Sequence, residues 1–139
     1  MTDAALLEKY ETYLRDEKKS SENTVSSYMR DLRQFSSYVA TNLDSQFGGV
    51  TESEVSGYMT WLKNAGKSTA TVSRSLASIK GFYAHNVLAG LLPNNPAARL
   101  SPDKAAHKLP QILTNREVEL LLAQPERNDA KGYRDCAML

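Results

Sequence analysis

The feature that most constrains the fold is a set of four apolar stripes with helical spacing. Within each stripe, apolar side chains recur three or four positions apart, which is the period of one face of an α-helix. The stripes lie within residues 4–18, 21–41, 55–62 and 68–89. No stretch of comparable length alternates apolar and polar residues as a half-buried strand does. The pattern predicts four helices and an all-α fold.

Capping residues mark where these helices begin and end. Polar N-caps accept hydrogen bonds from free amides of the first turn, and glycine adopts the left-handed backbone that closes the last turn. The expected N-caps are Asp3, Ser20 or Ser21, Thr51 in a capping box with Glu54, and Ser68. Gly66 and Gly90 stand where the third and fourth helices should end. We therefore expect an orthogonal four-helix bundle.

A proline-containing segment separates this bundle from the rest of the chain. Pro93 and Pro96 cannot donate a backbone hydrogen bond, so the fourth helix cannot continue through them. Residues 98–110 lack helical spacing, whereas Thr114 and Glu117 repeat the capping-box pattern ahead of a new apolar stripe. We predict a first domain over residues 1–98, a linker over 99–112 and, over 113–139, the truncated start of a second, mainly helical domain.

Composition excludes several classes of protein. No apolar run approaches the roughly 18 residues that cross a bilayer. The N-terminus carries Asp3 instead of a basic stretch before an apolar core, unlike a secretory signal. The single cysteine, Cys136, excludes an intrachain disulfide and a cysteine-rich zinc site. We therefore expect a cytoplasmic protein with no membrane partner.

Charge is distributed unevenly, although the net charge is only +1. Between Glu54 and Asp103 the chain has five basic residues and no carboxylate. Helical geometry with Leu32 and Leu76 at the core directions predicts outer faces for the second and fourth helices that also lack carboxylates. The predicted outer residues are Asn23, Ser26, Ser27, Arg30, Gln34 and Ser37 on the second helix, and Lys67, Thr71, Arg74, Ser78 and His85 on the fourth. Such residues hydrogen-bond to phosphates and base edges, whereas an ordinary solvated face mixes Glu with Lys.

Four segments in order resemble bacterial Xer-type tyrosine recombinases and phage integrases, over nearly the whole chain. They are the T-x-x-x-Y-x-x-D-L-x-x-F series of Thr24, Tyr28, Asp31, Leu32 and Phe35, the S-x-x-x-x-x-R-x-L-x-x-I-K-x-F-Y series from Ser68 to Tyr83, the pair Asn95-Pro96, and the L-P-x-x-L-T-x-x-E-V string over 109–118. This resemblance implies a SAM-like core-binding domain that, with a catalytic domain, clamps double-stranded DNA at a recombination half-site. It implies a tetramer of recombinase protomers as the assembly and no cofactor.

The same resemblance implies which residues touch DNA. The second and fourth helices would enter the major groove, and the linker would contact the backbone. The expected contacts are Asn23, Thr24, Ser27, Arg30, Lys67, Ser68, Thr71, Arg74 and Lys80 from the helices, and Lys104, His107 and Lys108 from the linker. Lys80 lies only about 40° from the core direction of its helix, so it either reaches a phosphate or extends along the surface.

We expect no catalytic activity from these residues alone. In this family a tyrosine nucleophile acts with two arginines, a lysine and histidines of a C-terminal domain, and the first of those arginines would lie beyond Leu139. Arg134 comes too early, and a structural or pairing role fits it better. His85 and His107 lack the flanking carboxylates of a metal site, so no metal is expected. One alternative stays open, a helical protein-interaction domain whose basic face is incidental, and so does the biological occasion, whether chromosome dimer resolution or phage or transposon integration.

Overall fold

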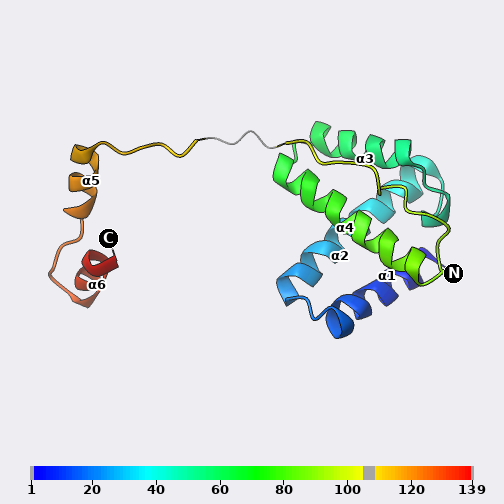
Figure 1. The fold of residues 1–139 in the computed structure, drawn as a ribbon, viewed down its shortest axis with the longest axis horizontal. Helices are drawn as coiled ribbons and strands as arrows, with labels where there is room; N and C mark the ends of the chain where they lie inside the picture. The colour runs from blue at the N-terminus through cyan, green and yellow to red at the C-terminus, as the bar shows by residue number, and fades with distance from the viewer. Residues whose placement is uncertain (1, 105–108, 139) are drawn as a thin grey trace. The chain divides into compact units, whose positions relative to one another are not determined.

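Four helices pack against one another in the first part of the chain (Figure 1). The computed structural model describes residues 2–104 and 109–138. The four helices are α1 (Asp3–Thr12), α2 (Glu22–Tyr38), α3 (Glu52–Asn64) and α4 (Thr69–Leu88). Wider π-helical turns, Tyr13–Glu17 and Val39–Leu43, extend α1 and α2, and a short 3-10 turn, Phe47–Gly49, precedes α3. The described residues contain no strand, and the predicted all-α bundle is confirmed.

Most of the predicted capping residues hold the helix ends. Ser21 and Ser68 accept from the amides of Thr24 and Thr71, and Thr51 forms its capping box with Glu54. Gly66 and Gly90 have φ angles of 80° and 69°, the left-handed conformation that ends α3 and α4.

The predicted N-cap of the first helix is wrong. Thr2 caps α1 by accepting a hydrogen bond from the amide of Ala5. The carboxylate of Asp3 instead accepts from the amide of Phe47, at 3.2 and 3.3 Å. Asp3 therefore joins the start of the chain to the segment before α3, and burial raises its pKa despite this hydrogen bond.

Helix α4 lies at the centre of the bundle, since it contacts α1, α2 and α3. Its residues Val72, Leu76, Ile79 and Phe82 are buried in the core. Small and polar side chains of the same helix are also buried, namely Ser75, Ser78 and Asn86. A helix with three neighbours must bury most of its circumference, and serine allows those neighbours to approach closely.

Phe47 joins the parts of the core together, a role that the sequence did not predict for it. Its ring is 1% exposed and lies 5.8 Å from the ring of Phe35 on α2 and 4.9 Å from that of Phe82 on α4. Its carbonyl accepts a hydrogen bond from the buried hydroxyl of Tyr83 at 2.9 Å. Burial raises the pKa of that hydroxyl.

Beyond α4 the chain continues to pack on the first bundle before it reaches the second unit. Leu100 packs against the core, and the ammonium of Lys63 at the end of α3 donates to the carboxylate of Asp103. The structure divides into two compact units, Met1–Ala105 and Ala106–Leu139. Packing on the first unit thus extends past residue 98, where the sequence predicts that the linker begins.

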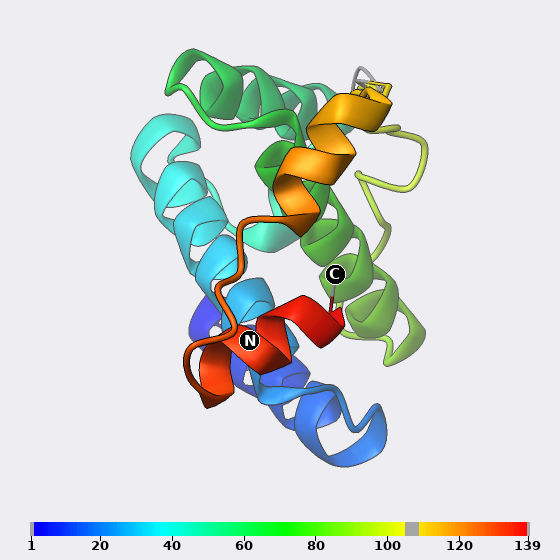
Figure 2. The ribbon, with the colours of Figure 1, turned by 90° about the vertical axis from the view of Figure 1, so that its left-hand side faces the viewer.

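The second unit contains two short helices, α5 (Asn115–Leu122) and α6 (Ala130–Met138), joined by residues 123–129 (Figure 2). Thr114 and Glu117 form the predicted capping box at the start of α5. Arg134 pairs with the neighbouring carboxylate of Asp135 at 2.9 Å, as its expected pairing role requires. Across all described residues, no helix has the length and hydropathy needed to cross a membrane.

Candidate nucleic-acid interface

The start of α2 combines a capped helix end with exposed polar and basic side chains. The hydroxyls of Ser21 and Thr24 lie 2.9 Å apart, and the amide of Thr24 donates to Ser21 Oγ at 3.3 Å. Asn23 and Arg30 are exposed, and Ser27 is half-buried. The expected outer face of α2 is therefore accessible to solvent at Asn23 and Arg30, and partly at Ser27.

The start of α4 repeats this arrangement. The hydroxyls of Ser68 and Thr71 lie 3.0 Å apart, and the amide of Thr71 donates to Ser68 Oγ at 3.2 Å. Lys67 precedes this cap and is exposed. Both helices thus begin with the same Ser-x-x-Thr cap, in which the threonine hydroxyl is already partnered.

The two capped ends lie on the same side of the first unit (Figure 1). A helix N-terminus carries a partial positive charge and amides without intrahelical partners, so it attracts anions such as phosphate. The nearest carboxylate on α2, Glu22, is paired with Arg15, whose guanidinium donates to both Glu22 oxygens at 2.6 and 3.1 Å and also to Glu11. The polarity of the two helix starts favours a negatively charged ligand.

The outer face predicted for α4 is partly wrong. Ser78 is fully buried and donates to the backbone carbonyls of Arg74 and Ser75 at 3.1 and 2.9 Å. His85 is half-buried beneath the ring of Tyr13, with ring centroids 4.3 Å apart, and burial lowers its pKa. The exposed stripe contains Ala70, Arg74, Ala77, Ala84 and Leu88. It is rotated by about 60° from the predicted direction, because α1 covers one side of α4.

Arg74 remains at the surface, but it is not a free cation. Its Nε donates to Asp31 Oδ2 at 2.9 Å, and its Nη2 donates to Asp31 Oδ1 at 3.1 Å. The side chain of Arg74 is 42% exposed, whereas that of Asp31 is 5% exposed. Hydrogen bonding to this carboxylate, together with its charge, raises the pKa of Arg74. The sequence pointed to Asp31 only as a motif position, although a carboxylate on the buried side of α2 was the available signal.

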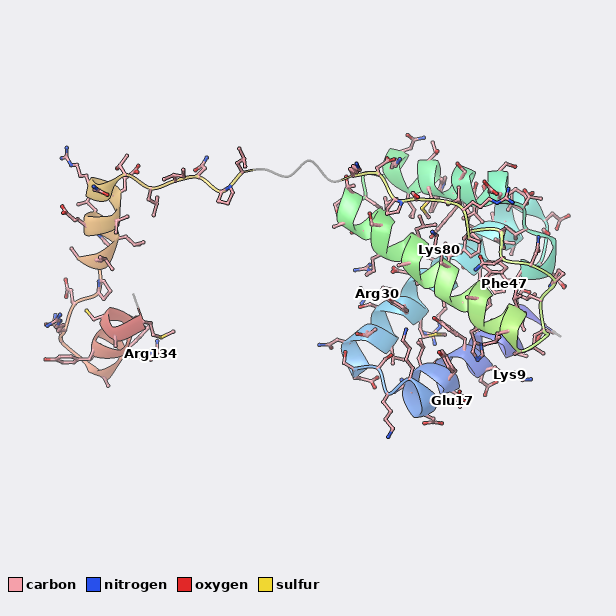
Figure 3. All side chains as sticks on the ribbon, in the orientation of Figure 1. Lys9, Glu17, Arg30, Phe47, Lys80 and Arg134 are labelled. Atoms are coloured by element: carbon pink, nitrogen blue, oxygen red, sulfur yellow. The ribbon has the colours of Figure 1, made fainter. Side chains whose placement is uncertain are left out.

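The other expected contacts lie further along the chain. Lys80 is half-buried on α4, and Arg30 is exposed on α2 (Figure 3). Lys104 is exposed directly after Asp103, which Lys63 holds beside the end of α3. His107 and Lys108 lie outside the described residues. The structure therefore brings the starts of α2 and α4 to one side of the unit (Figure 1) and leaves the linker contacts largely undescribed.

No metal site is apparent in the parts of the chain that the structure describes, where no three His, Cys, Asp or Glu side chains form a cluster. The free thiol of Cys136 lies 3.4 Å from the carbonyl of Pro125, within the second unit.

Comparison with known proteins gives consistent matches. Tyrosine recombinase XerC from Myxococcus xanthus is 37% identical over 134 residues, covering 96% of this chain and 44% of the relative. Tyrosine recombinases XerD from Oceanobacillus iheyensis and Listeria monocytogenes are 34% and 33% identical, each over 96% of this chain and over 45% and 46% of their own lengths. The chain thus spans less than half the length of these relatives. A search of solved structures finds no match.

The family profile described as phage integrase, N-terminal SAM-like domain, matches residues 7–90, which include all of α2, α3 and α4 and both capped helix starts. This match covers more than half of the chain and agrees with the all-α bundle. The chain belongs to the phage integrase N-terminal SAM-like domain family.

Proposed function

We propose that this chain binds double-stranded DNA at a recombination half-site, with the starts of α2 and α4 entering the major groove. In this proposal the longer protein is a site-specific tyrosine recombinase that acts in the cytoplasm. Its protomers form a tetramer during strand exchange, and the catalytic residues come from outside this chain. The names of the relatives, tyrosine recombinases XerC and XerD, support this role.

One observation carries the proposal, the pair of capped helix starts on the same side of the unit (Figure 1). Around them lie exposed Asn23, Arg30 and Lys67, whose side chains are of the types that bind phosphates and base edges. The one carboxylate in the first turn of α2, Glu22, is held by Arg15. A phosphate approaching either helix start would meet amides, hydroxyls and cations.

Fluorescence anisotropy with labelled duplexes, measured at several salt concentrations, tests the proposal directly. We expect log affinity to fall linearly with log salt, because each neutralised phosphate releases counterions. Arg30→Glu and Lys67→Glu should each weaken binding by about tenfold or more, since each loses a charge-assisted phosphate contact.

Lys9→Glu is the matched control. Lys9 is exposed on α1, away from the two helix starts (Figure 3), and its substitution changes the net charge by the same amount. It should weaken binding much less than Lys67→Glu does. An equal loss in Lys9→Glu, or no binding of the wild-type chain to any duplex at low salt, contradicts the proposal.

A protein-interaction domain is the second candidate, and one surface favours it. Trp61 on α3 is 40% exposed, and its ring lies 5.7 Å from that of Tyr58 and 5.3 Å from that of Tyr38. An aromatic side chain displayed in this way suits a protein contact. This candidate predicts self-association or partner binding that is insensitive to salt and is lost in Trp61→Ala, with no affinity for duplex DNA.

A further inference from the structure

We infer that Asp31 is a positioning residue for DNA binding, which aims the guanidinium of Arg74 outward and fixes the starts of α2 and α4 relative to each other. This inference rests on the proposed function, because it concerns how the same surface meets a phosphate. Asp31 is itself too deeply buried to touch DNA, so it acts only through Arg74 and through the two helices.

The guanidinium of Arg74 contacts Asp31 through only one of its edges. Both hydrogen bonds to Asp31 use the edge formed by Nε and Nη2, at 2.9 and 3.1 Å. A guanidinium is planar and has five N–H donors, so the donors of Nη1 point away from this carboxylate. Since the Arg74 side chain is 42% exposed, this second edge lies at the surface and can donate to a phosphate oxygen.

The position of the pair connects it to both capped helix starts. Arg74 lies six residues after the Ser68 cap, about 9 Å along the axis of α4, and Asp31 lies about 15 Å beyond the Ser21 cap on α2. The pair is the ion pair that joins α2 to α4 among the described residues, and these two helices contact each other more extensively than any other pair in the unit. A bidentate contact at this point restrains both the distance between the helices and the rotation of Arg74.

A contribution to folding stability does not by itself explain why a charged residue occupies the buried position of Asp31. Asp31 is the one buried charged residue in the described part of the chain. Removing a carboxylate from water is costly, and buried ion pairs are often no more stabilising than apolar residues of similar size. A residue that positions an outward-facing cation explains why charge is placed here.

The substitution Asp31→Asn separates positioning from simple electrostatics, because the two make opposite predictions. The substitution removes one negative charge, so long-range attraction of DNA would increase or stay the same. Asparagine has one acceptor oxygen where aspartate has two, so it cannot form the bidentate contact with Nε and Nη2, and a positioned Arg74 would lose its orientation. We expect Asp31→Asn to weaken duplex binding about five- to tenfold. The slope of log affinity against log salt should become shallower by about one, which corresponds to the loss of about one phosphate contact.

The experiment measures anisotropy with the full 139-residue chain at a temperature where unfolding curves show every variant to be folded. Arg74→Ala should lose the same affinity, and the double variant Asp31→Asn/Arg74→Ala should lose no more than either single variant. Arg74→Lys gives an independent test that retains the charge, since lysine lacks the planar fork that holds a carboxylate with one edge and presents a second edge to a phosphate. It should also bind severalfold more weakly.

Val39→Ala is the stability control, because Val39 is fully buried at the opposite end of α2 from the Ser21 cap and its truncation weakens the fold without changing charge. Wild-type affinity or tighter binding in Asp31→Asn would overturn the inference while leaving the proposed function intact. Additive losses in the double variant, or a loss of equal size in Val39→Ala, would overturn it as well. If the wild-type chain bound no duplex, the proposed function would fail first, and the inference would fail with it.

Discussion

Truncating Phe47 should cost the first unit a large part of its stability. Phe47 is 1% exposed and packs on the rings of Phe35, Phe82 and Tyr83, at centroid distances of 5.8, 4.9 and 6.2 Å. Replacing a buried phenylalanine by alanine costs about 3–5 kcal/mol, and the cost is higher where the surroundings cannot collapse. Here the Phe47 amide is held by Asp3 and its carbonyl by Tyr83. We therefore expect Phe47→Ala to lower the free energy of unfolding by about 4 kcal/mol.

Urea unfolding followed by far-ultraviolet circular dichroism measures this loss. A domain of this size has a total stability of about 5–15 kcal/mol, so the urea midpoint should fall by about a quarter or more. Phe47→Leu keeps most of the volume and should cost about 1–1.5 kcal/mol. Leu88→Ala, at a side chain that is 90% exposed, should change stability by less than about 0.5 kcal/mol. A loss below about 1.5 kcal/mol in Phe47→Ala would refute the assignment of Phe47 as the residue that joins the core.

Three further predictions concern local contacts. Ser68→Ala removes the hydroxyl that caps α4 and should lower stability by about 1 kcal/mol, or Tm by about 5 °C, in a thermal melt. A Cβ at Gly81 would lie 2.7 Å from Tyr10 Oη, so Gly81→Ala should destabilise the wild-type chain. In a Tyr10→Phe background the same change should become neutral or stabilising, because alanine is the better helix former. Burial lowers the pKa of His85 from its ordinary value of 6.5, although Glu17 opposes this shift. The folded state therefore favours neutral His85, and unfolding free energy should fall as the pH drops from about 7.5 to 5.5, less steeply in His85→Gln.

Helix positions and most helix ends were predictable from the sequence, because capping and periodicity are local. Ser21, Thr51 and Ser68 each meet an amide within three residues, so short segments suffice to identify them. Asp3 failed as a predicted cap because its partner, the amide of Phe47, lies 44 residues away. A side chain that can serve either a local or a distant amide cannot be assigned from its own segment.

The exposed face of the candidate interface was predictable on α2 and only partly on α4. The difference comes from the number of helices that pack against α4. α2 keeps an exposed outer face, on which Asn23 and Arg30 are found as expected. α4 packs against three helices, so Ser78 is buried although it lies opposite Leu76 by helical geometry. The Asp31–Arg74 pair could not be predicted because it depends on how α2 crosses α4.

Burial of much of α4 limits the number of cations that the proposed DNA-binding surface presents. Beyond Arg74 the exposed stripe of α4 carries Ala77, Ala84 and Leu88, which offer nothing to a phosphate. Among the helix residues proposed to contact DNA, the exposed cations are then Arg30, Lys67 and the outer edge of Arg74. Three phosphate contacts give a slope of log affinity against log salt of about −2.7, against about −5 to −9 for proteins that make six to ten such contacts. If the proposed function holds, the first unit alone should therefore bind a half-site weakly, with a shallow salt dependence that the anisotropy titration measures.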